Sequence, residues 1–282
     1  MSLIVPSLLC LGASLAGGPL SPDKPMTDEN PLLTESPLPF RYPRFDAIRT
    51  EHFSPAFDQG MAENRREIAA IAQNPEKPTF ENTVVAMERS GQLLARTSRI
   101  FFALNGANTN PEMQKLQREM APKLAAHTDS IALDPALFAR VRALYETRDE
   151  LGLDPESKRL LWRYHRDFVR AGATLSEADK EKLKALNSEL ATLGATFNQN
   201  VLKEVAASAV LVDTRAELAG LSEAQVVAAA DAAKAAGSEG KFLLRLTNTS
   251  GQPPLASLEN RGLREKLMKA SLARGSRGGE FD

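Results

Sequence analysis

Hydrophobic residues between positions 44 and 205 recur at a spacing near 3.6, and the runs begin with a repeated start signal. The signal is a short polar residue followed by proline. The polar side chain can cap the free amides at a helix start, and proline lacks the amide hydrogen that the first helical position leaves unpaired. The pattern predicts a multi-helix domain over residues 44–205, with helices starting at Ser54-Pro55, Asn110-Pro111, Asp134-Pro135 and Asp154-Pro155.

The clearest helix is expected from Ser176 to about Glu204. The segment from Ser176 to Asp179 has the sequence of a capping box, in which polar side chains bind the first free amides. The same helical spacing predicts that Lys180, Glu181 and Lys184 face water. Apolar residues at steps of three and four are expected to form the core-facing stripe, namely Leu183, Leu186, Leu190, Leu193, Phe197 and Val201.

Another helix is expected to start at Thr79 and to continue without a break past residue 100. Glycine costs a helix interior about 1 kcal/mol relative to alanine. Gly91 is therefore expected to have a packing role, in which its small size lets a neighbouring helix approach. The inner stripe of this helix would consist of Met87, Gly91, Leu94, Ser98 and either Phe101 or Phe102.

After residue 205 the helical pattern gives way to short apolar runs. Residues 209–212 and 242–246 have the length of strands, and a helix with a capping box at Ser222 lies between them. These signals predict a small strand-helix-strand insert over residues 206–250. The fold class expected for the chain is therefore mostly α, a multi-helix domain with a small α/β insert near the carboxyl terminus.

The last part of the chain, residues 251–282, is interpreted as the start of a truncated helical region. A turn is expected over residues 248–254. It is followed by a helix over residues 258–272, with Leu263, Leu267 and Ala270 on one face.

The amino-terminal residues allow two interpretations. Residues 1–22 carry no charge, and Leu3 to Ala16 resembles the apolar part of a secretory signal, although a basic start is missing. Alternatively, residues 1–25 are an upstream extension and Met26 is the natural start. The apolar stretch is too short and too interrupted for a membrane-spanning helix. Residues 26–43 are rich in proline and are expected to form an extended arm on the surface.

Composition excludes several classes of function. The chain has 282 residues, 43% of them hydrophobic, which is ordinary for a folded protein. Lys and Arg number 35 against 36 Asp and Glu, so the net charge of -1 argues against a nucleic-acid partner. The single cysteine, Cys10, excludes an internal disulfide and a zinc site built from cysteine pairs.

Candidate chemistry is sparse. The only histidines are His52, His127 and His165, and none has a second histidine within one helical turn, as a zinc hydrolase helix would require. No GxSxG nucleophile motif occurs. The basic and aromatic residues around Trp162 and Tyr164 are interpreted as a core stripe with a solvated flank. We therefore assign no catalytic, cofactor-binding or metal-ligating residue from the sequence.

Several short motifs nevertheless occur along the chain in a characteristic order. They are Phe45-Asp46-Ala47-Ile48, His52-Phe53-Ser54-Pro55-Ala56, Pro78-Thr79-Phe80-Glu81-Asn82-Thr83, Glu88-Arg89-Ser90-Gly91, Leu258-Glu259-Asn260-Arg261 and Gly279-Glu280-Phe281-Asp282. Together they resemble the amino-terminal region of the thimet-oligopeptidase-like zinc metallopeptidases of family M3. Within that family the bacterial peptidyl-dipeptidases are the nearer branch, and oligopeptidase A is the next.

The resemblance implies the first part of a two-lobed, mostly helical peptidase built around a deep channel. Such a peptidyl-dipeptidase would release carboxyl-terminal dipeptides from oligopeptide substrates. Its zinc would be held by a His-Glu-x-x-His helix and a downstream Glu, in a carboxyl-terminal catalytic lobe that this sequence does not reach. We therefore expect an amino-terminal fragment that forms part of the channel wall, binds no zinc itself and is inactive alone.

Two alternatives remain open at this stage. The alternative function is a stand-alone helical module that binds extended peptides without cutting them. A cytoplasmic location is expected, with the periplasm as the alternative if the leader is a working signal.

Overall fold

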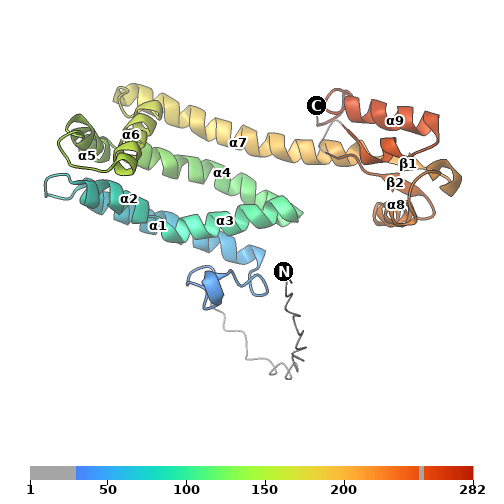
Figure 1. The fold of residues 1–282 in the computed structure, drawn as a ribbon, viewed down its shortest axis with the longest axis horizontal. Helices are drawn as coiled ribbons and strands as arrows, with labels where there is room; N and C mark the ends of the chain where they lie inside the picture. The colour runs from blue at the N-terminus through green and yellow to red at the C-terminus, as the bar shows by residue number, and fades with distance from the viewer. Residues whose placement is uncertain (1–29, 248–250, 282) are drawn as a thin grey trace, which may run out of the picture.

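The computed structural model describes residues 30–247 and 251–281, and this part of the chain is mostly helical (Figure 1). This confirms the expected fold class. In chain order the helices are α1 (Phe53–Ala72), α2 (Ala86–Arg89), α3 (Gln92–Ala107), α4 (Pro111–Ala132), α5 (Pro135–Glu146), α6 (Pro155–Arg170), α7 (Glu177–Ala207), α8 (Glu223–Ala235) and α9 (Arg261–Leu272).

Two short strands form the small sheet. Strand β1 (Val210–Val212) pairs antiparallel with β2 (Phe242–Leu244), and α8 lies between them in the sequence. The predicted strand-helix-strand order is thus confirmed. Helix α9 packs into the same core, because Leu263 and Leu267 belong to the cluster of buried residues formed by the sheet and α8.

Helix α7 connects the two ends of the molecule. Figure 1 shows α1 to α6 gathered at one end, and β1, β2, α8 and α9 at the other, with α7 running between them. A helix of 31 residues is about 45 Å long at 1.5 Å per residue. Along its first part, α7 packs against α4.

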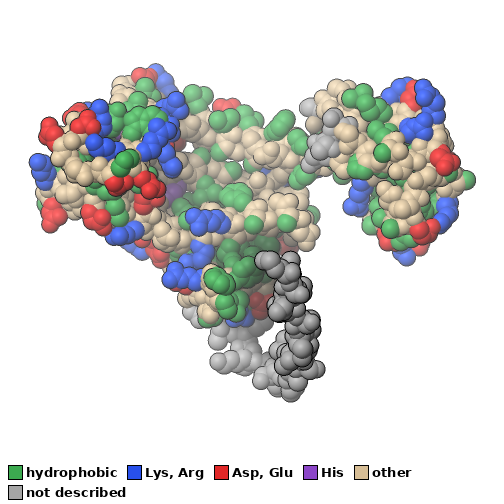
Figure 2. Space-filling model, viewed as in Figure 1, with side chains coloured by type: hydrophobic (Ala, Val, Ile, Leu, Met, Phe, Trp, Pro, Cys, Tyr) green, Lys and Arg blue, Asp and Glu red, His purple; other side chains and the backbone are tan. Residues whose placement is uncertain are grey.

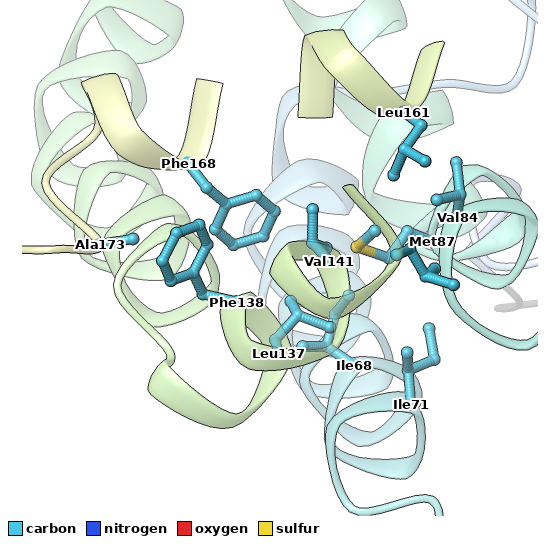
Figure 3. Close-up of a cluster of buried hydrophobic side chains, with 11 residues drawn as sticks. Ile68, Ile71, Val84, Met87, Leu137, Phe138, Val141, Leu161, Phe168 and Ala173 are labelled. Atoms are coloured by element: carbon cyan, nitrogen blue, oxygen red, sulfur yellow. The ribbon is translucent and has the colours of Figure 1, made fainter. Parts of the chain in front are cut away.

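The bundle has two clusters of buried hydrophobic side chains. One lies between α1, α2, α5 and α6, where Phe138 and Phe168 stack with ring centroids 5.9 Å apart (Figure 3). The other lies between α1, α3 and α4 and includes Leu32 from the segment before α1. The described part of the expected arm over residues 26–43 is therefore anchored to the bundle, since Leu32 is buried among Phe53, Phe57 and their neighbours.

Three of the four predicted proline starts have the expected cap. Asn110 accepts a hydrogen bond from the amide of Met113, and Asp134 and Asp154 cap α5 and α6 in the same way. The prediction for Ser54 is wrong. A 3₁₀ turn over Thr50–His52 leads directly into α1, which already begins at Phe53, so Ser54 lies inside the first turn and caps nothing.

The prediction of an uninterrupted helix from Thr79 is also wrong. Thr79 does cap a helical start, a π-helical segment over Phe80–Val85 that continues into α2, but the chain then breaks at Gly91. Gly91 has a φ of 69°, a left-handed conformation that glycine adopts without steric cost. Because of this break, the buried face of α3 does not continue the spacing of α2. Leu93, Thr97 and Ile100 are buried in α3, whereas Leu94 and Ser98 are only half-buried.

The predicted orientation of α7 is the largest error. Its bounds and its Ser176 cap are as expected, with the helix ending three residues later than predicted. Of the expected core-facing residues only Leu183 is half-buried, and the other five are exposed. Lys180, expected in water, is buried and pairs with Glu177 at 2.8 Å. We call the exposed set the α7 stripe: Leu186, Leu190, Leu193, Phe197 and Val201.

The reason for this error lies in the face that α7 presents to α4, which is small and polar. Asn187 donates a hydrogen bond of 2.8 Å to Asp129, and Gln199 donates one of 2.8 Å to the carbonyl of Gln114. Ala195 is buried between these two contacts. Periodicity correctly located the apolar face, but helix α4 covers a different one.

Some predictions fall outside the described residues. The leader or extension over residues 1–25, Cys10 and the alternative start at Met26 lie there, as does part of the turn predicted over residues 248–254. None of the described helices is both long enough and apolar enough to cross a membrane.

Candidate functional site

A cavity of about 570 Å³ lies within the helical bundle, between α1, α2, α3, α4 and α6. Most of its wall is apolar and is provided by residues such as Ile68, Met87, Leu94, Ile131 and Phe168. Apolar cavities with a few polar groups are the usual form of a ligand site. This makes the cavity the strongest binding candidate that the described residues offer.

His127 on α4 and Asn64 on α1 are the buried polar residues of this cavity wall. Nε2 of His127 lies 2.8 Å from Oδ1 of Asn64, whereas its Nδ1 has no hydrogen-bond partner in the described structure. Burial, and next the charge of Arg65, lowers the pKa of His127. The imidazole is therefore neutral at pH 7 and has one nitrogen free to accept a hydrogen bond.

Charged residues and a tyrosine lie at the rim of the cavity. Tyr164 donates a hydrogen bond of 2.8 Å to Glu88, and burial, followed by the effect of Glu88, raises the pKa of the phenol. Arg163 and Asp167 form an exposed pair at 3.8 Å. Exposed pairs of this kind contribute little stability, so both side chains can change partners at small cost.

The cavity can bind a small apolar group, but its polar residues do not form a catalytic pair. Ser90 and Thr128 bring hydroxyl groups to the wall, and they donate their protons to the backbone carbonyls of Met87 and Leu124 at 2.8 and 3.0 Å. A serine nucleophile would instead need a hydrogen bond to a base such as histidine. His127 is bound to an amide, which can orient the ring but cannot take a proton from it.

The other two histidines lie at different places and have other contacts. His52 accepts a hydrogen bond of 3.1 Å from the amide of Arg49 before α1. His165 on α6 stacks on Tyr145, with ring centroids 3.9 Å apart, and burial lowers its pKa. Within residues 30–247 and 251–281, no three His, Cys, Asp or Glu side chains are grouped as ligands for a metal ion. The described residues therefore do not fit a zinc site.

The basic and aromatic segment of α6 agrees with its prediction as a core stripe. Leu161 and Phe168 are buried, and Tyr164 is half-buried on the same side. On the flank, the guanidinium groups of Arg159 and Arg166 lie 3.9 and 4.6 Å from the ring of Trp162. These cation–π contacts give both guanidinium groups a partner within α6, so their positions are explained without a ligand.

An ion pair between the buried Glu204 and the more exposed Arg277 joins α7 to the end of the described chain. Both oxygens of Glu204 accept hydrogen bonds from Arg277, at 2.7 and 2.9 Å, and Ser208 donates a third at 3.1 Å. These bonds, with that of Arg277 as the largest contribution, lower the pKa of Glu204 to about 2. This pair could not be predicted from the sequence, because the two residues lie far apart in the chain and neither belongs to a chemical motif.

The α7 stripe is the most extensive apolar feature on the described surface that follows a single helix. Leu190 and Phe197 are each 68% exposed, and Leu186 and Leu193 are 61% and 57% exposed. In Figure 2, hydrophobic side chains project along the upper margin of the molecule, where Figure 1 places α7. Contiguous exposed apolar surface of this kind usually marks an interaction site.

Comparison with known proteins identifies relatives of the chain. The dipeptidyl carboxypeptidase of Escherichia coli strain K12 is 47% identical over 249 residues, which are 88% of this chain and 37% of the relative. The dipeptidyl carboxypeptidase of Salmonella typhimurium is 47% identical over 253 residues, again 37% of its length. Oligopeptidase A of Escherichia coli is 28% identical over 238 residues, 84% of this chain and 35% of the relative.

No family model matches the chain. The chain spans little more than a third of the length of the curated relatives that it matches. The identity to both enzymes extends over most of the chain, and it agrees with the order of motifs in the sequence. The chain is therefore a homologue of the dipeptidyl carboxypeptidases, and it shares more identity with them than with oligopeptidase A.

Proposed function

We propose that the chain is the amino-terminal part of a zinc-dependent peptidyl-dipeptidase, an enzyme that removes dipeptides from the carboxyl end of oligopeptides. One observation carries this proposal: the 47% identity to a protein named dipeptidyl carboxypeptidase, against 28% to oligopeptidase A. In this proposal the helical bundle forms part of the wall of the substrate channel.

The zinc chemistry is assigned to the part of the longer enzyme that this chain does not match. Zinc in such an enzyme would activate the water that attacks the peptide bond. None of the described residues is proposed as a ligand, because the three histidines lie apart and have other partners. The chain would contribute the scaffold that positions an extended peptide.

A hybrid protein tests the proposal. Residues 30–281 would replace the matching region of the Escherichia coli dipeptidyl carboxypeptidase, and the purified hybrid would be incubated with an oligopeptide blocked at its amino end. We expect release of carboxyl-terminal dipeptides, detected by mass spectrometry and abolished by a zinc chelator. The 282-residue chain alone, supplied with zinc, is expected to release none.

The matched control is the same oligopeptide with an amidated carboxyl end. A peptidyl-dipeptidase should lose activity on it, whereas an enzyme that cuts internal bonds should not. A folded, zinc-loaded hybrid that releases no dipeptide, or that cuts both peptides equally, would contradict the proposal. Chelator-sensitive dipeptide release by the 282-residue chain itself would contradict the assignment of the zinc chemistry.

The second candidate is a stand-alone helical module that binds peptides without cutting them. The apolar cavity next to His127 favours it, since about 570 Å³ is enough for a large side chain of a peptide. Calorimetric titration of the 282-residue chain with a blocked oligopeptide is the test. Saturable binding that is lost in His127→Leu but kept in His52→Leu would support this second candidate, and absence of heat would reject it.

The proposed location is the cytoplasm, with the periplasm as the alternative if residues 1–16 act as a signal. Mass spectrometry of the intact protein from cells distinguishes the two. Retention of Met1 or a start at Met26 agrees with the cytoplasm, whereas a start near Gly17 would indicate export.

A further inference from the structure

The α7 stripe has the spacing of a seam between two helices. From Leu183, a half-buried residue that precedes the stripe, to Phe197 the apolar residues follow each other at alternating steps of three and four, and Val201 follows after a further step of four. This is the repeat by which one helix packs its apolar side chains between those of a second. In the described structure no second helix covers the stripe, and all five of its members are exposed.

Helix α7 is held so that the stripe stays outside. The hydrogen bonds from Asn187 to Asp129 and from Gln199 to the backbone of α4 fix one face of the helix, and the pair between Glu204 and Arg277 fixes its end. Rotating the stripe toward α4 would break all of these contacts. The stripe therefore needs a cover from outside the described part of the chain.

The residues around the stripe are also unlike a solvated helix face. Residues 190–202 contain no Asp, Glu, Lys or Arg, whereas the outer face of a helix in water is normally charged. Thr192 and Thr196 donate their hydroxyl protons to carbonyls of α7 itself, each at 3.0 Å. Hydroxyls that are already satisfied can be covered by another segment without losing hydrogen bonds to water.

The relatives contain enough additional chain to supply a cover. The matched region is 37% of the Escherichia coli dipeptidyl carboxypeptidase, so most of that protein has no counterpart here. At the end of the described chain, the ring of Phe281 lies 5.2 Å from Nζ of Lys203, directly after Val201 and Leu202 on α7. Any segment that followed Phe281 would start beside the carboxyl end of the stripe.

We propose that the α7 stripe is a buried seam, onto which one amphipathic helix packs from the part of a dipeptidyl carboxypeptidase that this chain does not match. This inference rests on the proposed function and deepens it. It places the α7 stripe in the interface between the two parts of the enzyme. Its apolar side chains are then covered by protein and are not open to a water-filled substrate channel.

Cysteine labelling tests the proposal. Leu190→Cys and Phe197→Cys would be made in the 282-residue chain and in the hybrid with the Escherichia coli enzyme. Modification by a thiol reagent would then be followed at each site by mass spectrometry, because reactivity depends on exposure. We expect both sites to react at least about tenfold more slowly in the hybrid than in the chain alone, as a buried site should.

The matched control is Lys115→Cys on α4, a charged position whose side chain is 72% exposed. It is expected to react equally in both proteins. Circular dichroism would confirm that each variant is folded, and light scattering would give its mass at the labelling concentration.

Two outcomes would overturn the inference. Rapid modification of Leu190→Cys and Phe197→Cys in a folded hybrid would mean that the stripe is open, as in a channel wall. Slow modification in the chain alone, together with a doubled mass, would mean that a second copy covers the stripe. The labelling does not depend on activity, so the two proposals can fail separately. Protection of both cysteines without dipeptide release would retain the seam and reject the proposed function. Dipeptide release with rapid modification of both cysteines would retain the proposed function and reject the seam.

Discussion

The conformation of Gly91 determines where one helix ends and the next begins. Its φ is 69°, and a Cβ atom at this position would lie 3.0 Å from Nδ2 of Asn64. We predict that Gly91→Ala lowers the free energy of unfolding by about 1 to 2 kcal/mol, the cost of a left-handed backbone for a residue with a Cβ. Urea unfolding followed by circular dichroism measures this change.

The matched control for this substitution is Gly106→Ala in α3. Gly106 has open space around it and no positive φ. Gly106 lies in the last turn of α3, so alanine there is expected to raise the stability by no more than about 0.5 to 1 kcal/mol, the value for a helix interior. Equal effects of the two substitutions would show that Gly91 is not required for the break.

Gly91 also illustrates a limit of sequence analysis. Apolar spacing continues across it, from Met87 to Leu94 and Phe101, so periodicity alone predicts one helix. The spacing of side chains does not reveal that one backbone angle has changed sign. Whether a glycine is needed for close packing or for its backbone conformation can be decided only from the three-dimensional structure.

Glu204 should make the stability of the chain depend on acid pH. The Arg277 guanidinium and its neighbours hold the pKa of Glu204 at about 2, below the ordinary value of 4.5. A carboxylate with a lowered pKa in the folded state stabilises the fold fully above pH 4.5. This contribution declines as the pH falls from 4.5 toward 2.

We predict that Glu204→Gln lowers stability at pH 7 and that its difference from the wild type narrows between pH 4.5 and 2. Urea unfolding over this pH range measures both effects. Glu119→Gln, which removes an exposed pair with Lys115, is the control and should change stability little at any pH. A constant difference across the range would contradict the role given to the Glu204 carboxylate.

At the scale of whole elements, the caps show which helix starts depend on a side chain. Asn110 binds the amide of Met113 at the start of α4, whereas Ser54 caps nothing in α1. We predict that Asn110→Ala lowers the free energy of unfolding by about 1 kcal/mol and that Ser54→Ala changes it by less than about 0.5 kcal/mol. Thermal unfolding of the two variants compares them directly. Equal losses of stability would contradict the assignment of Asn110, and not Ser54, as a helix cap.

Most elements could be predicted from the sequence because their signals are local. The caps at Asn110, Asp134 and Ser176 and the apolar spacing along α7 each lie within a few residues. The orientation of α7 could not be predicted, since it depends on polar contacts with α4 more than fifty residues away. An apolar face marks where a helix can pack, but it does not identify which segment packs there.

At the scale of the whole molecule, the exposed α7 stripe should affect the behaviour of the 282-residue chain in solution. We predict that the chain binds a fluorescent dye specific for apolar surfaces, and that combined Leu190→Glu and Phe197→Glu substitutions remove most of this binding. The stability should change by no more than about 0.5 kcal/mol, because both side chains are exposed.

Val227→Glu on α8 is the control, since Val227 is 49% exposed but lies outside the stripe. Its dye fluorescence should stay near that of the wild type. Equal loss of fluorescence in the control would show that the dye binds elsewhere.

The relation to peptidases could be inferred from the sequence, but the cavity could not. The order of short motifs gave the family resemblance, and the identity to the dipeptidyl carboxypeptidases agrees with it. The cavity wall combines residues from distant segments, among them Asn64, Met87, His127 and Phe168, none of which belongs to a motif of ligand binding. Only the packing of the helices brings them together.

The position of Trp162 has a practical consequence for unfolding experiments. It is the only tryptophan of the chain and lies on α6 between two guanidinium groups, in the helical bundle. The core of β1, β2, α8 and α9 shares no buried residue with the clusters of the bundle. Intrinsic emission will therefore report melting at one end of the molecule only. A separate spectroscopic reporter, such as a dye attached to α9, is required to detect whether the far end melts at the same temperature.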